Sequence, residues 1–229
     1  MGKLIVIDGL DGSGKSTQCE LLLAELRAQG KNVRLVSFPR YESVGSTFVR
    51  LYLNGELGGD PSDTNAYAAA TFYALDRYYS YRKEWADFYA EPDAVVIAAR
   101  YTTANAVHQL SKLDRDYWDG YLSWLFDFEY EKLGIPKPDM VLYLEMKPEI
   151  SMKLIEQRNK ETGAHSDIHE KDAEYLNLCY KAALYAADKM GWEHIKCYDG
   201  KEPLSIEDIQ VMITEKVVRL LDVAGDGEN

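Results

Sequence analysis

A glycine-rich segment near the start of the chain carries residue types that bind phosphate. It reads Gly9-Leu10-Asp11-Gly12-Ser13-Gly14-Lys15-Ser16-Thr17 and fits the pattern GxxxxGK(S/T) between a strand-like and a helix-like stretch. Its glycines let backbone N–H groups converge on a phosphate, and the N-terminus of the following helix adds a partial positive charge. Lys15 is expected to reach the β- and γ-phosphates of a nucleotide, and the Ser16 hydroxyl to ligate Mg²⁺.

The phosphate-binding segment does not by itself identify the group that receives the phosphoryl, because GTPases, ATPases and kinases all share it. A guanine-reading NKxD sequence is not found. The nearest match, Asn159-Lys160-Glu161, is followed by Thr162 where an aspartate would be needed. This difference argues against a GTPase switch.

Two further clusters combine cations, aromatic rings and amides. Phe38-Pro39-Arg40-Tyr41 follows the second predicted strand, and Arg100, Asn105 and His108 follow the third. Pro39 fixes its own φ angle and ends the strand before it. Because ligands of open α/β folds bind at the carboxyl ends of the strands, both clusters are expected to lie at one ligand-binding edge.

Tyr73 and Arg77 form another pair with chemical potential. They are four residues apart, so they share one face of a predicted helix. An aromatic ring for stacking and a guanidinium for phosphate suit a nucleoside monophosphate. Taken alone the pair is weak evidence, because a tyrosine in a tyrosine-rich helix usually packs and an exposed arginine is usually solvated.

Short apolar runs alternate with longer amphipathic stretches along the whole chain. Strands are predicted at Lys3–Asp8, Asn32–Phe38, Ala94–Ala98, Met140–Leu144 and His194–Tyr198. Helices are predicted at Ser16–Gln29, Asn65–Tyr89, Asp116–Leu133, Pro148–Arg158, Ala173–Lys189 and Ile206–Leu221. Most of the strands are continuous apolar runs, which is typical of strands buried on both faces. The alternation predicts a three-layer α/β/α fold around a five-stranded parallel sheet.

The chain is expected to form one domain over residues 1–224, since no linker rich in Pro, Gly or Ser divides it. The polar stretch around residues 158–170 is interpreted as a mobile lid. Residues 225–229 are interpreted as a frayed polar tail. Within Asp116–Leu133, the aromatic side chains are expected to pack and the acidic ones to form a solvated face.

The charge balance limits the partners of the protein. The 229 residues carry a formal net charge of −12, which repels nucleic acid and anionic membranes, so neither is expected as a partner. Cys19, Cys179 and Cys197 form no CxxC pair and indicate buried reduced thiols. The N-terminal apolar run is too short for a signal peptide or a membrane helix. These features predict a cytoplasmic protein whose few cations gather around an anionic ligand.

In their order and combination, the motifs resemble those of the thymidylate kinase family of P-loop nucleoside monophosphate kinases. The resemblance extends from Lys3 to about Tyr198, and its motifs are Asp11 within the phosphate loop, Phe38-Pro39-Arg40, Tyr73 with Asp76-Arg77, Arg100-Tyr101 and Pro138-Asp139-Met140-Val141. It implies a P-loop kinase fold and transfer of the ATP γ-phosphoryl to dTMP, giving dTDP and ADP. It also implies Mg²⁺ as a cofactor and a homodimer.

The resemblance assigns several residues to the acceptor nucleoside. Tyr73 would stack on the thymine, while Arg77 and Asn105 would contact the base and its surroundings. His108 occupies a position where the family often has an aromatic ring that crowds the sugar 2′ position and favours deoxyribose.

Other residues are assigned by the resemblance to the phosphates. Arg40 and Arg100 would hold the dTMP phosphate, and Arg100 would also face the transferring phosphoryl. Asp11 would lie near the sugar 3′-hydroxyl and the phosphates. In the family, a basic residue near the γ-phosphate comes from either the phosphate loop or the lid. Gly12 and Ser13 are not basic, so the resemblance implies that the lid supplies this cation. Arg158 is the first candidate and Lys160 the second.

One position departs from the family pattern. The sequence Asp-Arg-Tyr of the family is Ala99-Arg100-Tyr101 in this chain, and alanine cannot hold a metal ion, a water or an arginine. The difference leaves open a catalytically impaired homologue, or a kinase in which Asp11 or a lid acid such as Asp167 or Glu170 takes over. A further alternative is a kinase for another deoxynucleotide, because Ala104 stands where a small hydroxyl residue is expected.

Overall fold

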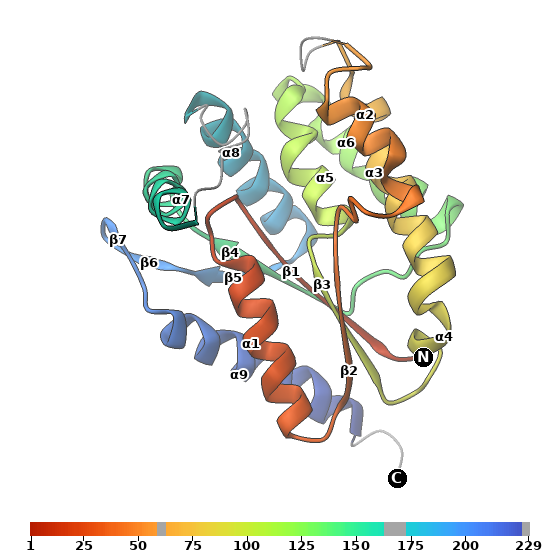
Figure 1. The fold of residues 1–229 in the computed structure, drawn as a ribbon, viewed down its shortest axis with the longest axis vertical. Coiled ribbons are helices and arrows are strands. Elements are labelled where there is room, and N and C mark those ends of the chain that lie inside the picture. Colours follow the sequence, from red (N-terminus) through yellow and green to blue (C-terminus); the bar gives the residue numbers. More distant parts are fainter. Residues whose placement is uncertain (59–62, 163–172, 226–229) are drawn as a thin grey trace.

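A parallel five-stranded sheet lies at the centre of the computed structural model, which describes residues 1–58, 63–162 and 173–225 (Figure 1). The strands lie in the order β2-β3-β1-β4-β5. They are β1 (Lys3–Gly9), β2 (Asn32–Ser37), β3 (Ala94–Ala99), β4 (Met140–Glu145) and β5 (Glu193–Lys196). The predicted fold class, a five-stranded parallel sheet covered by helices on both faces, is confirmed.

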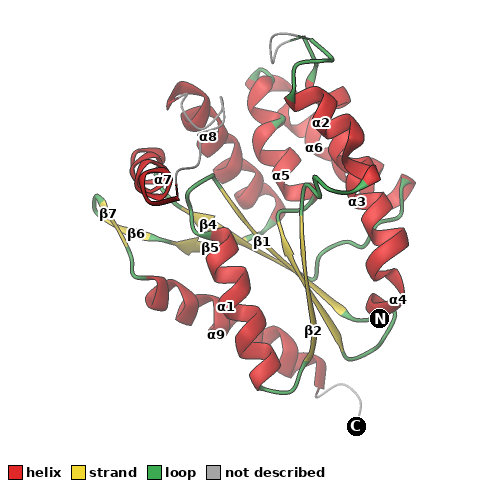
Figure 2. Cartoon of the chain, in the orientation of Figure 1, coloured by secondary structure: helices red, strands yellow, loops and turns green. Residues whose placement is uncertain are grey.

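Helices connect successive strands, as parallel pairing requires (Figure 2). They are α1 (Lys15–Ala28), α2 (Thr47–Leu53), α3 (Ala66–Ser80), α4 (Ala86–Tyr89), α5 (Thr102–His108), α6 (Trp118–Phe126), α7 (Pro148–Thr162), α8 (Ala173–Met190) and α9 (Ile206–Gly225). Two π-helical turns, Tyr81–Trp85 and Asp127–Lys132, continue α3 and α6. Within the described residues, no helix is long and apolar enough to cross a lipid bilayer.

The inner strands β1 and β3 are buried on both faces, whereas the edge strands β2 and β5 are partly exposed. Alternate side chains of β1 enter different parts of the core. Ile5 and Ile7 of β1 pack with α1 and α9 on one face of the sheet. Leu4 and Val6 of the same strand pack on the other face, near Trp85 and Tyr89 of the segment that follows α3. Since a strand directs successive side chains to opposite faces, a continuous apolar run is what this environment selects.

Several element boundaries differ from the predictions. The predicted strand His194–Tyr198 ends at Lys196, and Tyr198–Asp199 instead pairs with Glu202–Pro203 in a small antiparallel hairpin, β6–β7. The helix predicted to end at Arg158 continues to Thr162, so the first part of the predicted lid is helical. The rest of that lid, including Asp167 and Glu170, lies outside the described residues, as do residues 226–229 of the predicted tail.

The three cysteines agree with the prediction for reduced thiols. Cys19, Cys179 and Cys197 are all buried and free. Cys19 and Cys197 pack in the cluster between the sheet and helices α1 and α9. They therefore contribute apolar contacts to the core rather than a covalent link.

Candidate active site

The glycine-rich segment forms a tight loop between β1 and α1. The strand ends at Gly9, and the helix begins at Lys15 after Gly14, whose φ of 89° is left-handed. Gly12 also has a positive φ, and a Cβ atom there would lie 2.7 Å from the carbonyl oxygen of Ser151 in α7. Both glycines are therefore required by the backbone, as expected for a loop that presents N–H groups to a phosphate.

Lys15 lies inside this loop, at the N-terminus of α1. Its side chain is only 7% exposed, and Nζ donates to the carbonyl oxygens of Gly9 (2.9 Å) and Leu10 (2.6 Å). Burial and the charge of Arg100 lower the pKa of Lys15 to about 8, although the Asp11 carboxylate raises it. The ammonium group is thus held by the loop at the place where nucleotide phosphates would bind.

Asp11 and Arg100 form an ion pair between the phosphate loop and the end of β3. The Asp11 carboxylate also lies 3.8 Å from Lys15 Nζ. Burial alone would raise the pKa of Asp11, but the charges of Arg100 and Lys15 outweigh it and lower that pKa well below its usual range. Arg100 itself has a φ of 63°, which is uncommon for a residue with a side chain and is found most often at functional sites.

A buried carboxylate, Asp8, lies at the same edge of the sheet, and the sequence analysis did not identify it as a site residue. Asp8 is 1% exposed and accepts hydrogen bonds from Thr103 Oγ1 (2.5 Å) and the Gly9 amide (2.8 Å). Burial raises its pKa, while the charges of Lys15 and Arg100 oppose that rise. Its sequence signal is an acid that ends an apolar strand directly before the phosphate loop.

A pocket opens beside the loop. Its empty volume, counted out into the open solvent at its mouth, is about 710 Å³. Its lining contains most of the predicted ligand-binding residues, namely Asp11, Phe38, Pro39, Tyr41, Tyr73, Arg77, Arg100, Asn105 and His108. The structure therefore brings residues from four separate chain segments to one place at the carboxyl edge of the sheet.

The predicted phosphate-binding arginines Arg40 and Arg158 are not part of the lining of this pocket. Arg40 Nη1 lies 2.5 Å from the carboxylate of Glu84, in the π-helical turn after α3. Arg158 is exposed on α7, where its guanidinium donates to the side chain of its neighbour Asn159. Ser16, the predicted magnesium ligand, is exposed in the first turn of α1. These placements leave the predicted roles of Arg40, Arg158 and Ser16 as predictions.

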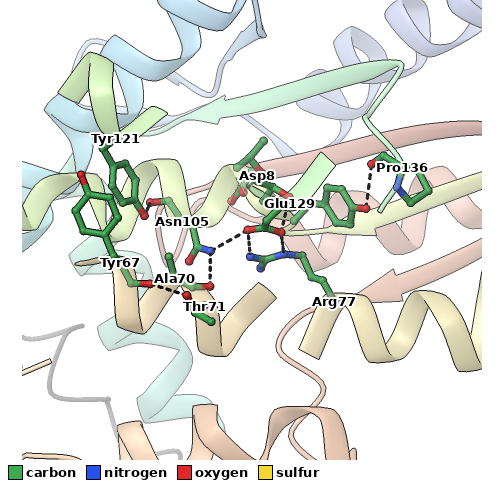
Figure 3. Close-up of polar contacts among 12 residues, drawn as sticks. Asp8, Tyr67, Ala70, Thr71, Arg77, Asn105, Tyr121, Glu129 and Pro136 are labelled. Carbon is green, nitrogen blue, oxygen red and sulfur yellow. Dashed lines mark hydrogen bonds and ion pairs between the residues drawn. The ribbon is translucent and has the colours of Figure 1, made fainter. Parts of the chain in front are cut away.

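Arg77 pairs with an acid that the sequence analysis placed wrongly. Glu129 lies in the π-helical turn Asp127–Lys132, within the stretch whose acidic residues were expected to form a solvated face. It is instead 0% exposed, and its carboxylate lies 2.7 Å from Arg77 Nε and 2.6 Å from Nη2 (Figure 3). Burial would lower the pKa of Arg77, but the charge of Glu129 and its hydrogen bonds raise that pKa above its usual value.

The aromatic part of the pocket also contains residues for which the sequence predicts no ligand contact. Tyr52 of α2 packs edge-on against Tyr73, with ring centroids 6.5 Å apart. The Tyr175 hydroxyl of α8 lies 3.2 Å from His108 Nδ1. Gln109, at the end of α5, also contributes to the lining. Tyr52 was missed because α2 is only seven residues long, and Tyr175 because α8 is distant in sequence.

The fold and the loop together define the class of the protein. A parallel sheet with a glycine-rich phosphate loop between its central strand and the next helix is the architecture of P-loop phosphotransferases and related NTPases. The sequence model of the family described as thymidylate kinase matches residues 7–213. The chain belongs to the thymidylate kinase family, which confirms the resemblance given by its motifs.

Individual relatives agree with this family. The thymidylate kinase of Mycobacterium tuberculosis (strain H37Rv) is 34% identical over 192 residues, covering 82% of this chain and 87% of the relative. A probable thymidylate kinase of Thermococcus gammatolerans is 32% identical over 165 residues, covering 71% and 74%. The thymidylate kinase of Arabidopsis thaliana is 25% identical over 215 residues, covering 93% and 72%.

Proposed function

We propose that this protein transfers the γ-phosphoryl group of ATP to dTMP and produces dTDP and ADP. The observation that carries the proposal is the Asp11–Arg100 ion pair, which joins the phosphate loop to the adjacent pocket. The phosphate loop, which would bind a nucleoside triphosphate, thus borders directly on the pocket, which would bind a second nucleotide. Phosphoryl transfer depends mainly on such positioning and on charge stabilisation, because the protein need supply little covalent chemistry.

On the donor side, the backbone N–H groups of the loop and Lys15 would bind the phosphates of ATP. Mg²⁺ fits this site, because the exposed Ser16 hydroxyl at the start of α1 and the buried Asp8 carboxylate supply the oxygen donors that it prefers. When bound, Mg²⁺ would neutralise charge on the phosphates of ATP. Arg158 of α7 is proposed as the further cation at the γ-phosphate.

On the acceptor side, Tyr73 is proposed to stack on the base, and Arg77 and Asn105 to contact its edge. His108 would border the sugar, since its ring lies in the lining and is held near Tyr175. Arg100 would face the phosphate of dTMP and the phosphoryl group in transfer. Arg40 is proposed to join it, which requires exchange of the Glu84 carboxylate for phosphate.

The proposal is tested by measuring ADP release with purified protein, ATP, Mg²⁺ and a panel of acceptors. We expect turnover of dTMP, with weaker turnover of dUMP, and little with dGMP or free thymidine. Strong turnover of another nucleotide without any turnover of dTMP would contradict the proposal.

Ala99 motivates the alternative function, a nucleotide-binding homologue without catalysis. The family relationship favours the active kinase. The structure also supplies a buried carboxylate close to Ala99. Ala99 of β3 pairs with Ile7 of β1, and the next residue of β1 is the buried Asp8. We therefore expect the wild type to be active and Ala99→Asp to change kcat by less than about tenfold, or 1.4 kcal/mol. Ala99→Ser, a small polar control, should likewise change kcat by less than about tenfold. A silent wild type with an active Ala99→Asp variant would establish a disabled kinase.

A homodimeric assembly and a cytoplasmic location are also proposed. The family resemblance supports a homodimer, and sedimentation equilibrium would give its mass in solution. The free buried cysteines suit a reducing compartment, which supports a cytoplasmic location.

A further inference from the structure

The carboxylate of Glu129 joins three elements beneath the nucleotide pocket (Figure 3). Its Oε2 atom accepts hydrogen bonds from Arg77 Nε of α3 (2.7 Å) and Thr102 Oγ1 of α5 (2.9 Å). Its Oε1 atom accepts from Arg77 Nη2 (2.6 Å) and Asn105 Nδ2 of α5 (3.2 Å). All four groups are buried. Two of the residues so bound, Arg77 and Asn105, also line the pocket.

The contacts of Arg77 fix the direction in which its remaining donors point. Nε and Nη2 form the two-pronged pair with Glu129, an arrangement that holds the plane of the guanidinium. Nη1 takes part in none of the hydrogen bonds between described residues. Because the residue lines the pocket, Nη1 presents N–H donors to a ligand there.

The contacts of Asn105 fix the orientation of its amide in the same way. Its Nδ2 group donates to the carbonyl oxygen of Ala70 (3.1 Å) and to Glu129 (3.2 Å), which uses both of its hydrogens. The Oδ1 atom is therefore the group that remains for the pocket, where it can only accept. Since Arg77 Nη2 and Asn105 Nδ2 share the same Glu129 oxygen, the donor and the acceptor are neighbours.

We propose that Glu129 is a positioning residue that sets which class of pyrimidine the pocket accepts. Thymine and uracil carry a carbonyl acceptor beside the N3–H donor, which matches a donor from Arg77 beside an acceptor from Asn105. Cytosine carries an amino donor beside an N3 acceptor, which is the reverse pattern. The inference rests on the proposed function, and it assigns the choice of base to a residue that does not itself line the pocket.

Glu129→Gln tests this role because it keeps the shape and replaces one acceptor with a donor. The new NH₂ group must face an N–H of Arg77 in either orientation, and at the Oε1 position it also faces Asn105 Nδ2. There the Asn105 amide can rotate to accept the new N–H, at the cost of its hydrogen bond to Ala70, and it then presents its NH₂ to the pocket. We expect the ratio of kcat/KM for dTMP over dCMP to fall by about 10–100-fold. The dTMP to dUMP ratio should not change, since those bases share one edge. The KM for ATP should not change either.

Two control variants separate positioning from a general loss of stability. Thr102→Val removes one hydrogen bond to Glu129 and leaves Arg77 and Asn105 bound, so the dTMP to dCMP ratio should be preserved even if the protein melts earlier. Asp127→Asn removes an exposed acid from the same helical turn and should change neither property. If Glu129→Gln does not fold, Glu129→Asp, which keeps the charge on a shorter side chain, should lower the ratio partway.

The possible results distinguish this inference from the proposed function. A Glu129→Gln protein that melts earlier but keeps the wild-type dTMP to dCMP ratio would overturn the positioning role and leave only a structural one. A wild type with no turnover of dTMP would instead contradict the proposed function. In that case, calorimetric binding of dTMP and dCMP to wild type and Glu129→Gln still decides the inference, because base preference does not require catalysis.

Discussion

Replacement of Lys15 by alanine is expected to lower kcat for the ATP-dependent phosphorylation of dTMP by about 10³-fold, the upper range for loss of one charge-stabilising donor. Lys15 Nζ is held at the centre of the phosphate loop by the carbonyl groups of Gly9 and Leu10. The neighbouring Asp11 and Asp8 are acids and cannot replace it, and the guanidinium of Arg100 is held in its ion pair with Asp11. The measurement is steady-state ADP release at saturating dTMP.

Binding of dTMP should survive the Lys15→Ala change, because Lys15 does not belong to the lining of the adjacent pocket. Titration calorimetry with dTMP alone measures this directly. Lys3→Ala is the matched control, since Lys3 begins β1, at the end of that strand opposite the phosphate loop, and pairs with Asp139 at 3.0 Å. It should leave kcat unchanged. If Lys15→Ala lost dTMP binding but kept turnover per bound complex, the division between the two sites would be wrong.

The pKa of Lys15 adds a pH dependence to the same prediction. Burial lowers this pKa to about 8 in the free protein, so the ammonium is charged below that pH and becomes neutral above it. The value of kcat/KM for ATP reports groups of the free enzyme. It should therefore decline as the pH rises through about 8, and in Lys15→Arg the decline should move to higher pH.

The inner strands β1 and β3 could be predicted from the sequence because their residues experience the same buried environment on both faces. Continuous runs such as Ala94–Ala99 satisfy that environment, and all six residues of this strand are buried. Helix α2 could not be predicted in the same way. It spans seven residues, its N-cap residue Ser46 makes no side-chain capping bond, and Val49 is its buried residue. Its position depends on packing against α3 rather than on its own pattern.

The phosphate loop and most of the pocket could also be predicted, because they follow strand ends that share one edge. The pairing of Arg40 with Glu84 could not be predicted, because an arginine binds a carboxylate and a phosphate with the same geometry. Glu129 could have been predicted. It lies four residues after the buried Leu125, in the helical turn that continues α6, and an acid in line with such a buried stripe needs a buried partner. Arg77 likewise lies on the buried stripe of α3, three residues after the buried Ala74, so it also needs a buried partner of opposite charge.

Replacement of Arg100 by methionine is expected to lower kcat/KM for dTMP by about 10³–10⁵-fold, the range that a transition-state arginine contributes in related NTPases. Arg100 is the cation that contacts both parts of the site, because it lines the pocket and pairs with Asp11 of the phosphate loop. Arg100→Lys should recover only part of the loss, since an ammonium cannot make the two-pronged contact of a guanidinium.

Methionine is the informative replacement because of the backbone at this position. Arg100 has a φ of 63°, and any residue with an unbranched side chain is strained there to a similar degree. Methionine thus removes the charge without changing the strain, whereas glycine would relieve it and mix two effects. Arg27→Met, on an exposed arginine at the far end of α1, is the control and should leave turnover unchanged. Wild-type turnover in Arg100→Met with an intact fold would show that the developing charge is stabilised elsewhere, and Arg158 would then be the next residue to replace.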